Sequence, residues 1–217
     1  MITLYDFVLS ANCYKLRLLM SMLDVPYESV PIDFHPGREH KGEAFREINP
    51  LGHIPVIDDD GYVLRDANAI LVYLATRYDP SNAWYPIDDP HRLGEVAQWM
   101  TFSDATANTA SAARLHVNFA YDFPIDEVRA GAHELFAVLD EHLWFREREA
   151  SEPGGPAWVA TGSAPTIADL ALFPDVVLAE EGGVSLLDYP ALIRWADRVR
   201  QIPGFIVMPG VFPHGTS

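Results

Sequence analysis

The hydrophobic pattern of the chain changes character near residue 79, and this change limits the possible folds more than any other feature. Before it, short runs with strand-like alternation are interleaved with helical patterns. The segment from Asp79 to Pro90 then contains three prolines among aspartates, a composition that favours an irregular connection. Only helical patterns follow it. We therefore predict an α/β domain over residues 1–78, a linker over 79–90 and an all-helical domain over 91–217.

The first 78 residues predict the element order β-α-β-α-β-β-α. We expect strands at 2–6, 27–33, 54–57 and 62–64, and helices at 12–24, 44–48 and 67–78. A helical crossover between the first two strands implies that they run parallel, whereas the Asp-Asp-Asp-Gly turn at 58–61 implies an antiparallel hairpin. The sequence therefore predicts a thioredoxin-like arrangement.

The remainder of the chain predicts helices separated by short connections. They are expected at 91–119, 125–149, 167–180 and 190–201, with Trp and Phe side chains supplying most of the core between them. Pro174 falls inside one of these patterns and is expected to remove a hydrogen bond and kink that helix. Residues beyond Pro203 are expected to be irregular.

Composition and charge exclude several classes of function. The chain has 15 Lys plus Arg against 31 Asp plus Glu, a net charge of −16, which predicts repulsion from nucleic acid and anionic membranes. No run of apolar residues is long enough to span a membrane, and the N-terminus lacks a secretion signal, so we expect a cytoplasmic protein. One cysteine, Cys13, excludes an internal disulfide or a cysteine-built zinc site. His35 and His40 are not spaced as a helical metal pair, and we predict no metal.

The segment Ser10-Ala11-Asn12-Cys13-Tyr14-Lys15-Leu16-Arg17 lies where the first strand gives way to the first helix. Serine is a good N-cap, and the unpaired amides of a helix N-terminus favour an anion such as a thiolate. A free thiol has a pKa of about 8.5, so a donor directed at a bound thiol raises its ionised fraction. Ser10 or Asn12 is a candidate for that donor. The other interpretation, in which Ser10 is only a helix cap, stays open on this segment alone.

A second segment, Asn49-Pro50-Leu51-Gly52-His53-Ile54-Pro55-Val56, places a proline at the start of a strand. An Ile-Pro bond there can be held in the cis form, leaving the N–H and C=O of Ile54 free to pair with a peptide ligand as an added strand does. A trans proline that opens an edge strand is the alternative. Asp66, before the helix at 67–78, is either an N-cap or an acceptor for a ligand's ammonium group.

Taken together, these segments resemble the cytosolic glutathione transferase family over essentially the whole chain. The Ser-x-Asn-x-x-Lys start of the first helix is similar to members, bacterial ones among them, in which a serine or an asparagine activates the thiol. The segment at 49–56 is similar to the one that holds the family's cis-proline, and the segment at 66–74 to its acidic-Ser-x-Ala-Ile stretch. Thr166-Ile167-Ala168-Asp169 resembles the family's capping box, which makes Asp169 structural rather than catalytic.

The resemblance implies a role for each candidate residue. Ser10 would donate to the thiol of glutathione, the co-substrate, with Asn12 as its partner. The backbone at Ile54 and Pro55 would bind the cysteinyl part of glutathione. Asp66 and the amide of Ala67 would bind the γ-glutamyl group. The glycine carboxylate would be bound by His40, Lys41 or His53. The family typically has Ser or Thr where this chain has Ala67, so the hydroxyl that usually helps to hold the γ-glutamyl carboxylate is missing here.

A second pocket for a small hydrophobic electrophile is expected between the domains, near Phe7, Leu9, Asp104, Asn108 and Arg114. Arg114 is either a contact for an acidic substrate or part of a surface salt bridge. The resemblance also implies a homodimer.

Three alternatives to a conjugating enzyme stay open. The first is a thiol oxidoreductase that uses Cys13, although serine stands where that chemistry needs cysteine. The second is a binding or interaction protein that shares the fold without catalysis. The third is a glutathione-dependent isomerase, dehalogenase or ether-cleaving enzyme, which needs the same thiolate.

Overall fold

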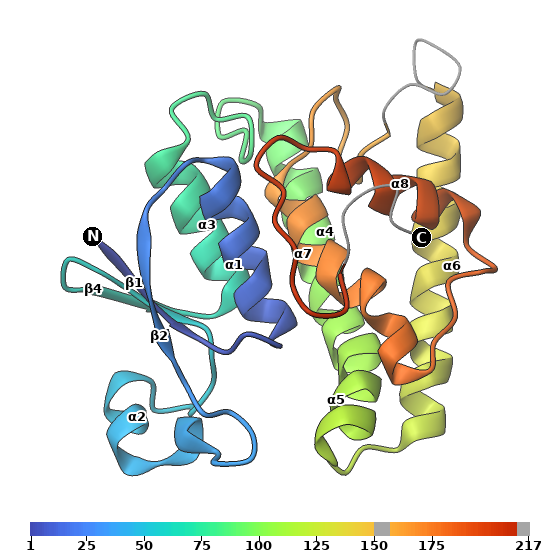
Figure 1. The fold of residues 1–217 in the computed structure, drawn as a ribbon. Helices are drawn as coiled ribbons and strands as arrows, with labels where there is room; N and C mark the ends of the chain where they lie inside the picture. The colour runs from blue at the N-terminus through green and yellow to red at the C-terminus, as the bar shows by residue number, and fades with distance from the viewer. Residues whose placement is uncertain (150–156, 212–217) are drawn as a thin grey trace.

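The structure, a computed structural model, describes residues 1–149 and 157–211. Its first part carries a four-stranded sheet with helices, and its second part is helical (Figure 1). This confirms the predicted thioredoxin-like domain followed by an all-helical domain. No helix within 1–149 or 157–211 combines the length and apolar character that a membrane span requires.

The sheet contains β1 (Ile2–Asp6), β2 (Tyr27–Pro31), β3 (Val56–Asp59) and β4 (Tyr62–Arg65) in the spatial order β2-β1-β3-β4. The pair β1–β2 is parallel and the hairpin pair β3–β4 is antiparallel, as predicted. The pair β1–β3, for which the sequence analysis made no prediction, is also antiparallel. The third strand begins at Val56 rather than at Ile54, because Pro55 has no N–H to donate to a ladder. The Ile54–Pro55 bond is cis, as predicted, and His35–Pro36 is a second cis bond that the sequence analysis did not anticipate.

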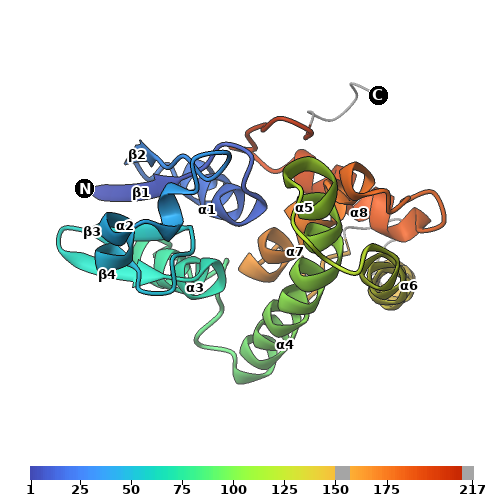
Figure 2. The same ribbon diagram turned by 90° about the horizontal axis from the view of Figure 1, so that it is seen from below.

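Helices cover the sheet on two sides. On one side lie α1 (Ala11–Met22) and α3 (Ala67–Tyr78), between the sheet and the helical domain (Figures 1 and 2). On the other side lie η1 (Glu39–Lys41) and α2 (Glu43–Ile48), which form a short helical connection. There Phe45 packs with Ile32 and Val56 in a second, smaller hydrophobic cluster. The sheet is therefore buried against α1 and α3 through the main core.

The helical domain follows a connection without regular structure. Its elements are α4 (Pro90–Thr106), the π-helical turn η2 (Ala107–Ser111), α5 (Ala112–Phe119), α6 (Ile125–Glu149), α7 (Ile167–Val177), η3 (Ala179–Gly182) and α8 (Pro190–Arg200). The predicted helix at 91–119 is thus continuous but contains one π-turn. The predicted helix at 167–180 ends at Val177, and a 3₁₀ turn follows.

The first turn of α7 is a capping box, as predicted. Thr166 Oγ1 accepts a hydrogen bond from the amide of Ala168 at 3.3 Å, and the amide of Thr166 donates to Asp169 Oδ2 at 2.8 Å. Asp169 is fully buried and also accepts from Trp195 Nε1 at 2.9 Å and from the amide of Val159 at 3.1 Å. Burial raises the pKa of its carboxyl, and the hydrogen bonds from Thr166, Trp195 and Val159 oppose that effect. Asp169 therefore organises the core of the helical domain.

The two domains are joined by buried polar contacts along α1. Lys15 Nζ lies 2.9 Å from Asp175 Oδ2, and both side chains are almost fully buried. The hydroxyl of Ser111 donates to the other oxygen of Asp175 at 2.5 Å, while Tyr14 Oη donates to the carbonyl of Ile206 at 2.6 Å. A buried ion pair specifies one arrangement more than it stabilises it, so these contacts set how α1 sits against the helical domain.

Candidate active site

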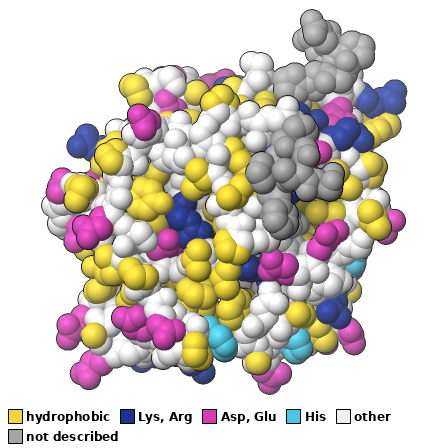
Figure 3. Space-filling model, viewed as in Figure 1, with side chains coloured by type: hydrophobic (Ala, Val, Ile, Leu, Met, Phe, Trp, Pro, Cys, Tyr) yellow, Lys and Arg dark blue, Asp and Glu magenta, His cyan; other side chains and the backbone are white. Residues whose placement is uncertain are grey.

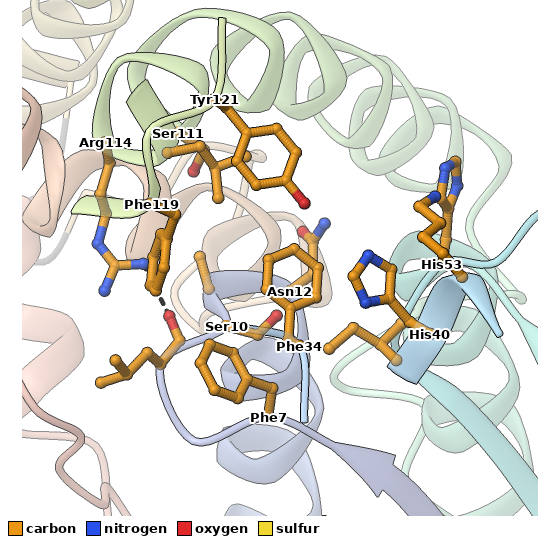
Figure 4. Close-up of a pocket in the computed structure, with 15 residues that line it drawn as sticks. Phe7, Ser10, Asn12, Phe34, His40, His53, Ser111, Arg114, Phe119 and Tyr121 are labelled. Atoms are coloured by element: carbon orange, nitrogen blue, oxygen red, sulfur yellow. Dashed lines mark hydrogen bonds between the residues drawn. The ribbon is translucent and has the colours of Figure 1, made fainter. Parts of the chain in front are cut away.

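A cavity of about 270 Å³ lies where the N-terminus of α1 meets α5 (Figure 4). The first domain contributes the end of β1, the start of α1 and the loops after β2 and α2, and the second contributes the last turn of η2 and α5. Hydrophobic side chains gather at the centre of the face in Figure 3, between the two domains. The lining residues are Phe7, Leu9, Ser10, Ala11, Asn12, Phe34, His40, Lys41, His53, Ile54, Ser111, Arg114, Leu115, Phe119 and Tyr121.

Ser10 is the N-cap of α1, with extended backbone angles, and it also lines the cavity. Its Oγ accepts a hydrogen bond from the amide of Cys13 at 3.2 Å. That bond uses an oxygen lone pair and not the hydroxyl proton, so Ser10 can cap the helix and donate to a ligand at once. The first turn of α1 contains no acidic residue, so no carboxylate of that turn competes for its amides. The two interpretations of Ser10 are therefore compatible.

Asn12 connects this cavity to a neighbouring one. A second cavity of about 180 Å³ is lined by Asn12, Asn49, Leu51, His53, Ile54, Pro55, Arg65, Asp66 and Ala67. Asn12, His53 and Ile54 line both cavities. The main chain of Ile54 makes no hydrogen bond to another residue within 1–149 or 157–211. An extended ligand could therefore occupy both cavities and run alongside Ile54, with Ser10 and Asn12 on one side of it.

His40 is a buried polar side chain at the cavity wall. Only 1% of its surface is exposed, and neither ring nitrogen has a hydrogen-bond partner among the described residues. Its ring stacks on Phe34 with centroids 4.2 Å apart. Burial, helped by the nearby charges of Lys41 and Arg38, lowers the pKa of His40 to about 4. Its imidazole is therefore neutral at physiological pH, with one donor and one acceptor free for a ligand.

Lys41 and His53 lie beside His40 (Figure 4 shows His53). Lys41 Nζ donates to the carbonyl of Gly52 at 2.6 Å, and burial together with Arg46 and Arg38 lowers its pKa. Burial and the charge of Lys41 lower the pKa of His53. The loop that carries His53 is held by Asn49, whose Nδ2 donates to the carbonyl of His53 at 2.7 Å. This corner of the cavity is thus rich in N–H donors although the protein as a whole is strongly acidic.

Asp66 and Ala67 stand at the start of α3, in the second cavity. Asp66 is the N-cap of that helix, and its Oδ1 accepts from the amide of Ala69 at 2.9 Å. Its φ of 77° lies in the left-handed region, where a residue other than glycine is strained, and such strain gathers at functional positions. Arg65, which the sequence analysis did not single out, lines the same cavity and adds a positive charge.

Arg114 forms a salt bridge with Glu181, in line with one of the two interpretations of the sequence, but its own side chain is buried rather than at the surface, with 5% of the residue exposed. Its Nε lies 2.5 Å from Glu181 Oε2, and its Nη1 donates to the carbonyl of Leu9 at 2.7 Å (dashed line in Figure 4). The guanidinium therefore links α5 to η3 and to the β1–α1 connection, with its charge compensated by Glu181.

Phe7 and Leu9 line the cavity with Arg114, whereas Asp104 and Asn108 do not. Asp104 accepts a hydrogen bond from Asn68 Nδ2 at 3.0 Å and so faces α3. Regular 3.6-residue spacing would place 104, 108, 111 and 115 on one face of a helix. The π-turn η2 breaks that spacing, so Ser111 and Leu115 reach the cavity and the two earlier residues do not.

The aromatic lining was largely missed from sequence. Phe34, Phe119 and Tyr121 line the cavity together with the predicted Phe7. Phe34 follows the second strand, and Phe119 and Tyr121 lie at and just beyond the end of α5. Aromatic residues at such element ends are a signal that could have been used. Their convergence, however, depends on the packing of the two domains.

Cys13 does not have the properties of a catalytic thiol. It is fully buried, and burial raises its pKa to about 12. The acidic Asp6 nearby adds to that shift. A nucleophilic cysteine needs exposure and a lowered pKa, so a disulfide oxidoreductase that uses Cys13 is excluded. Among residues 1–149 and 157–211, no group of three or more His, Cys, Asp or Glu is arranged to hold a metal ion.

Comparison with known proteins agrees with this architecture. The model of the glutathione S-transferase N-terminal domain matches residues 4–82. Glutathione S-transferase GstB of Escherichia coli is 28% identical over 94% of this chain and 95% of its own length. Maleylacetoacetate isomerase of Pseudomonas aeruginosa is also 28% identical, over 93% of this chain and 92% of its own length. A possible glutathione S-transferase structure from Rhodopseudomonas palustris superposes with a TM-score of 0.82 at 29% identity, covering 95% and 97% of the two chains.

The structure thus combines a thioredoxin-like and a helical domain with two adjoining cavities at the start of α1. Residues 4–82 match the glutathione S-transferase N-terminal domain, and the chain as a whole is similar in sequence and fold to glutathione S-transferases.

Proposed function

We propose that the protein is a glutathione transferase that ionises the thiol of bound glutathione and directs it at a small hydrophobic electrophile. The observation that carries the proposal is the position of Ser10, a helix N-cap whose side chain also lines the cavity. A hydroxyl donor and the positive end of α1 both favour a thiolate over a thiol. The thiolate attacks the electrophilic carbon, a C–S bond forms, and the leaving group or the acceptor atom takes up the electron pair.

The neighbouring groups fit the other parts of the tripeptide. Ile54, with its unpaired main chain, would hold the cysteinyl residue as an added strand does. Asp66 would accept from the γ-glutamyl ammonium group, and the amide of Ala67 would bind the adjacent carboxylate. His40, Lys41 and His53 form the donor-rich corner that suits the glycine carboxylate.

Glutathione-dependent isomerisation is the second candidate function. It is favoured by the isomerase from Pseudomonas aeruginosa, which is as similar to this chain as the transferase GstB is. Both reactions start from the same thiolate. They differ in whether the C–S bond formed with the substrate is kept or broken again, so product analysis separates them.

The test is a calorimetric titration of the protein with reduced glutathione, combined with the ultraviolet absorbance of the bound thiolate over a pH series. We expect binding, with the thiol pKa lowered from its free value, and loss of that shift in Ser10→Ala. Binding with an unshifted thiol pKa would favour a binding protein over an enzyme. No binding at millimolar glutathione would overturn the proposal, and the missing hydroxyl at Ala67 would then be the first cause to examine.

A homodimer is part of the proposal, by the family resemblance stated above. Light scattering coupled to size-exclusion chromatography measures the mass in solution. A mass near 48 kDa, twice the 24.2 kDa of one chain, is the expected result, and a mass of one chain would contradict it.

A further inference from the structure

The cavity carries a ladder of nearly parallel rings that spans both domains. Phe34 stacks on His40 with an interplanar angle of 16° and is parallel to Tyr121 within 10°, at centroid distances of 4.2 and 6.1 Å. Tyr121 is in turn parallel to Phe123 within 11°. His40 and Phe34 belong to the first domain, while Tyr121 and Phe123 follow α5 in the second. Figure 4 shows Phe34 at the centre of the lining residues, between His40 and Phe119.

Two further rings complete the wall around Phe34. Phe7 lies 5.4 Å from it in a stacked arrangement, and Phe119 lies 6.2 Å from it edge to face. Phe34 is thus the one described residue whose ring contacts His40, Phe7, Phe119 and Tyr121 alike. It is only half buried, so part of its surface remains for a ligand. Aromatic rings prefer offset-stacked or edge-to-face partners, and such pairs stabilise beyond the effect of the area that they bury.

The charged side chains at the cavity already have partners within the protein and do not favour a charged second substrate. The guanidinium of Arg114 is compensated by Glu181 at 2.5 Å and by the carbonyl of Leu9. Lys41 donates to Gly52, and His40 is neutral at physiological pH. The remaining lining on the side of α5 is apolar or hydroxylic. An ionised group placed there would be desolvated without a free partner, which is costly.

The size of the cavity suits one substituted ring. A cavity of about 150 Å³ in another protein holds benzene. This cavity measures about 270 Å³, and part of that volume belongs to the thiol end and the glycine carboxylate of glutathione. We propose, as a refinement that rests on the proposed function, that the second substrate presents a planar, uncharged aromatic group which stacks on Phe34, and that Phe34 determines specificity for it.

The experiment compares two conjugates that differ only in the planarity of one ring. S-benzylglutathione and S-(cyclohexylmethyl)glutathione carry the same tripeptide, so a difference in Kd reports on the ring alone. We expect the benzyl conjugate to bind about 5–10-fold more tightly, the equivalent of one favourable ring stack. In Phe34→Leu the preference should fall to within about 2-fold. Because Phe34 stacks on His40, the Kd of glutathione itself can change too, but that change affects both conjugates equally and leaves their ratio as the readout.

Two control variants separate stacking from a general disturbance of the loop. Phe34→Trp keeps a planar ring and should keep the preference. Phe123→Leu shortens the ladder at a residue outside the cavity lining and should leave the preference unchanged. A circular dichroism melt of each variant checks that the fold is retained.

The same selectivity should appear in turnover. Benzyl and cyclohexylmethyl isothiocyanate react with the thiolate at the same carbon, forming a C–S bond while the nitrogen takes up a proton. We expect kcat/KM to favour the benzyl compound by about the same factor. A 4-carboxybenzyl isothiocyanate should gain nothing over it, and a clear preference for the acid would overturn the uncharged class in favour of recognition by Arg114.

Failure of the inference and failure of the proposed function differ in outcome. If glutathione binds but the two conjugates bind equally, or if Phe34→Leu keeps the preference, the aromatic assignment is wrong and the transferase proposal stands. If neither glutathione nor either conjugate binds, both are wrong.

Discussion

The helices α1 and α7 each begin at a residue whose hydroxyl accepts a hydrogen bond from the first turn, and their N-termini are built in opposite ways. At α7, Thr166 and Asp169 satisfy each other's amides inside a fully buried capping box. At α1, Ser10 accepts from Cys13, but the third helical residue is a cysteine rather than an acid, and the cap lines a cavity. The first arrangement uses up the anion-binding capacity of the helix end. The second leaves that capacity for a ligand.

The difference shows why a cap can be structural at one helix and chemical at another. A carboxylate in the first turn neutralises the positive end of a helix, and burial then excludes any outside anion. Without such a carboxylate, a solvent-accessible helix end is an anion site that still needs a ligand. The predictions below test this contrast, beginning with the largest effect.

Removing the carboxylate from the capping box at the N-terminus of α7 should have the largest effect, which is a loss of stability. Asp169→Ala leaves the donors of Thr166, Val159 and Trp195 buried without their acceptor. Each such donor costs about 1–3 kcal/mol, so we expect a loss of roughly 3–5 kcal/mol in the free energy of unfolding. Urea denaturation measures it, with Asp197→Ala, a partly exposed acid on α8, as a control expected to change little. An unchanged midpoint would show that the box does not organise this domain.

Removing the hydroxyl from the N-terminus of α1 should reduce catalytic activity more than stability. For Ser10→Ala we expect a loss of about 1 kcal/mol in stability from the missing cap. The loss of kcat/KM should reach about 10–100-fold, equivalent to roughly 1.4–2.7 kcal/mol, because the donor to the thiolate is gone. Ser10→Thr keeps a hydroxyl and should recover most of the activity. Equal losses of stability in Ser10→Ala and Thr166→Ala, without an effect on turnover, would reduce Ser10 to a cap.

The buried imidazole of His40 should make stability depend on pH. Its pKa is about 4 in the folded protein against an ordinary value of 6.5, so between these values the unfolded state binds more protons. The free energy of unfolding should therefore fall as the pH is lowered from 6.5 to 4. His40→Gln should flatten this dependence by about 1–2 kcal/mol. Thermal melts at half-unit pH intervals measure it, and identical slopes in both proteins would show that His40 titrates normally.

The smallest effect is expected at Cys13, which occupies the third position of α1, where α7 has Asp169. Because its thiol is buried and its pKa is raised to about 12, Cys13→Ala should change kcat/KM by less than about 2-fold. Iodoacetamide should not label the native wild-type protein at neutral pH, and mass spectrometry detects the adduct. Rapid labelling accompanied by loss of activity would return the thiol to the mechanism.

Much of this site could be read from local sequence. The capping box at 166–169, the cis bond before Pro55 and the position of Ser10 at the start of α1 each depend on a few adjacent residues, and the structure has all three. Asp104 and Asn108 were expected near the second pocket, but they do not line the cavity, whereas Ser111 and Leu115 do. The π-turn η2 interrupts the regular spacing of the helix in this region. The local sequence pattern of that helix does not predict a π-turn.

The sequence by itself determined the change from a mixed to a helical architecture, the parallel first pair of strands, the antiparallel hairpin and the caps, because these follow from hydrophobic period and turn chemistry over short distances. Only the tertiary structure decided which side chains meet across the cavity. Phe34 reaches Tyr121, Arg114 reaches Glu181 and Leu9, and Lys15 reaches Asp175, over separations of 67 to 160 residues where bonds are recorded. Such contacts depend on how elements far apart in the sequence pack against one another around a core that both domains share. No local preference of the backbone encodes that packing.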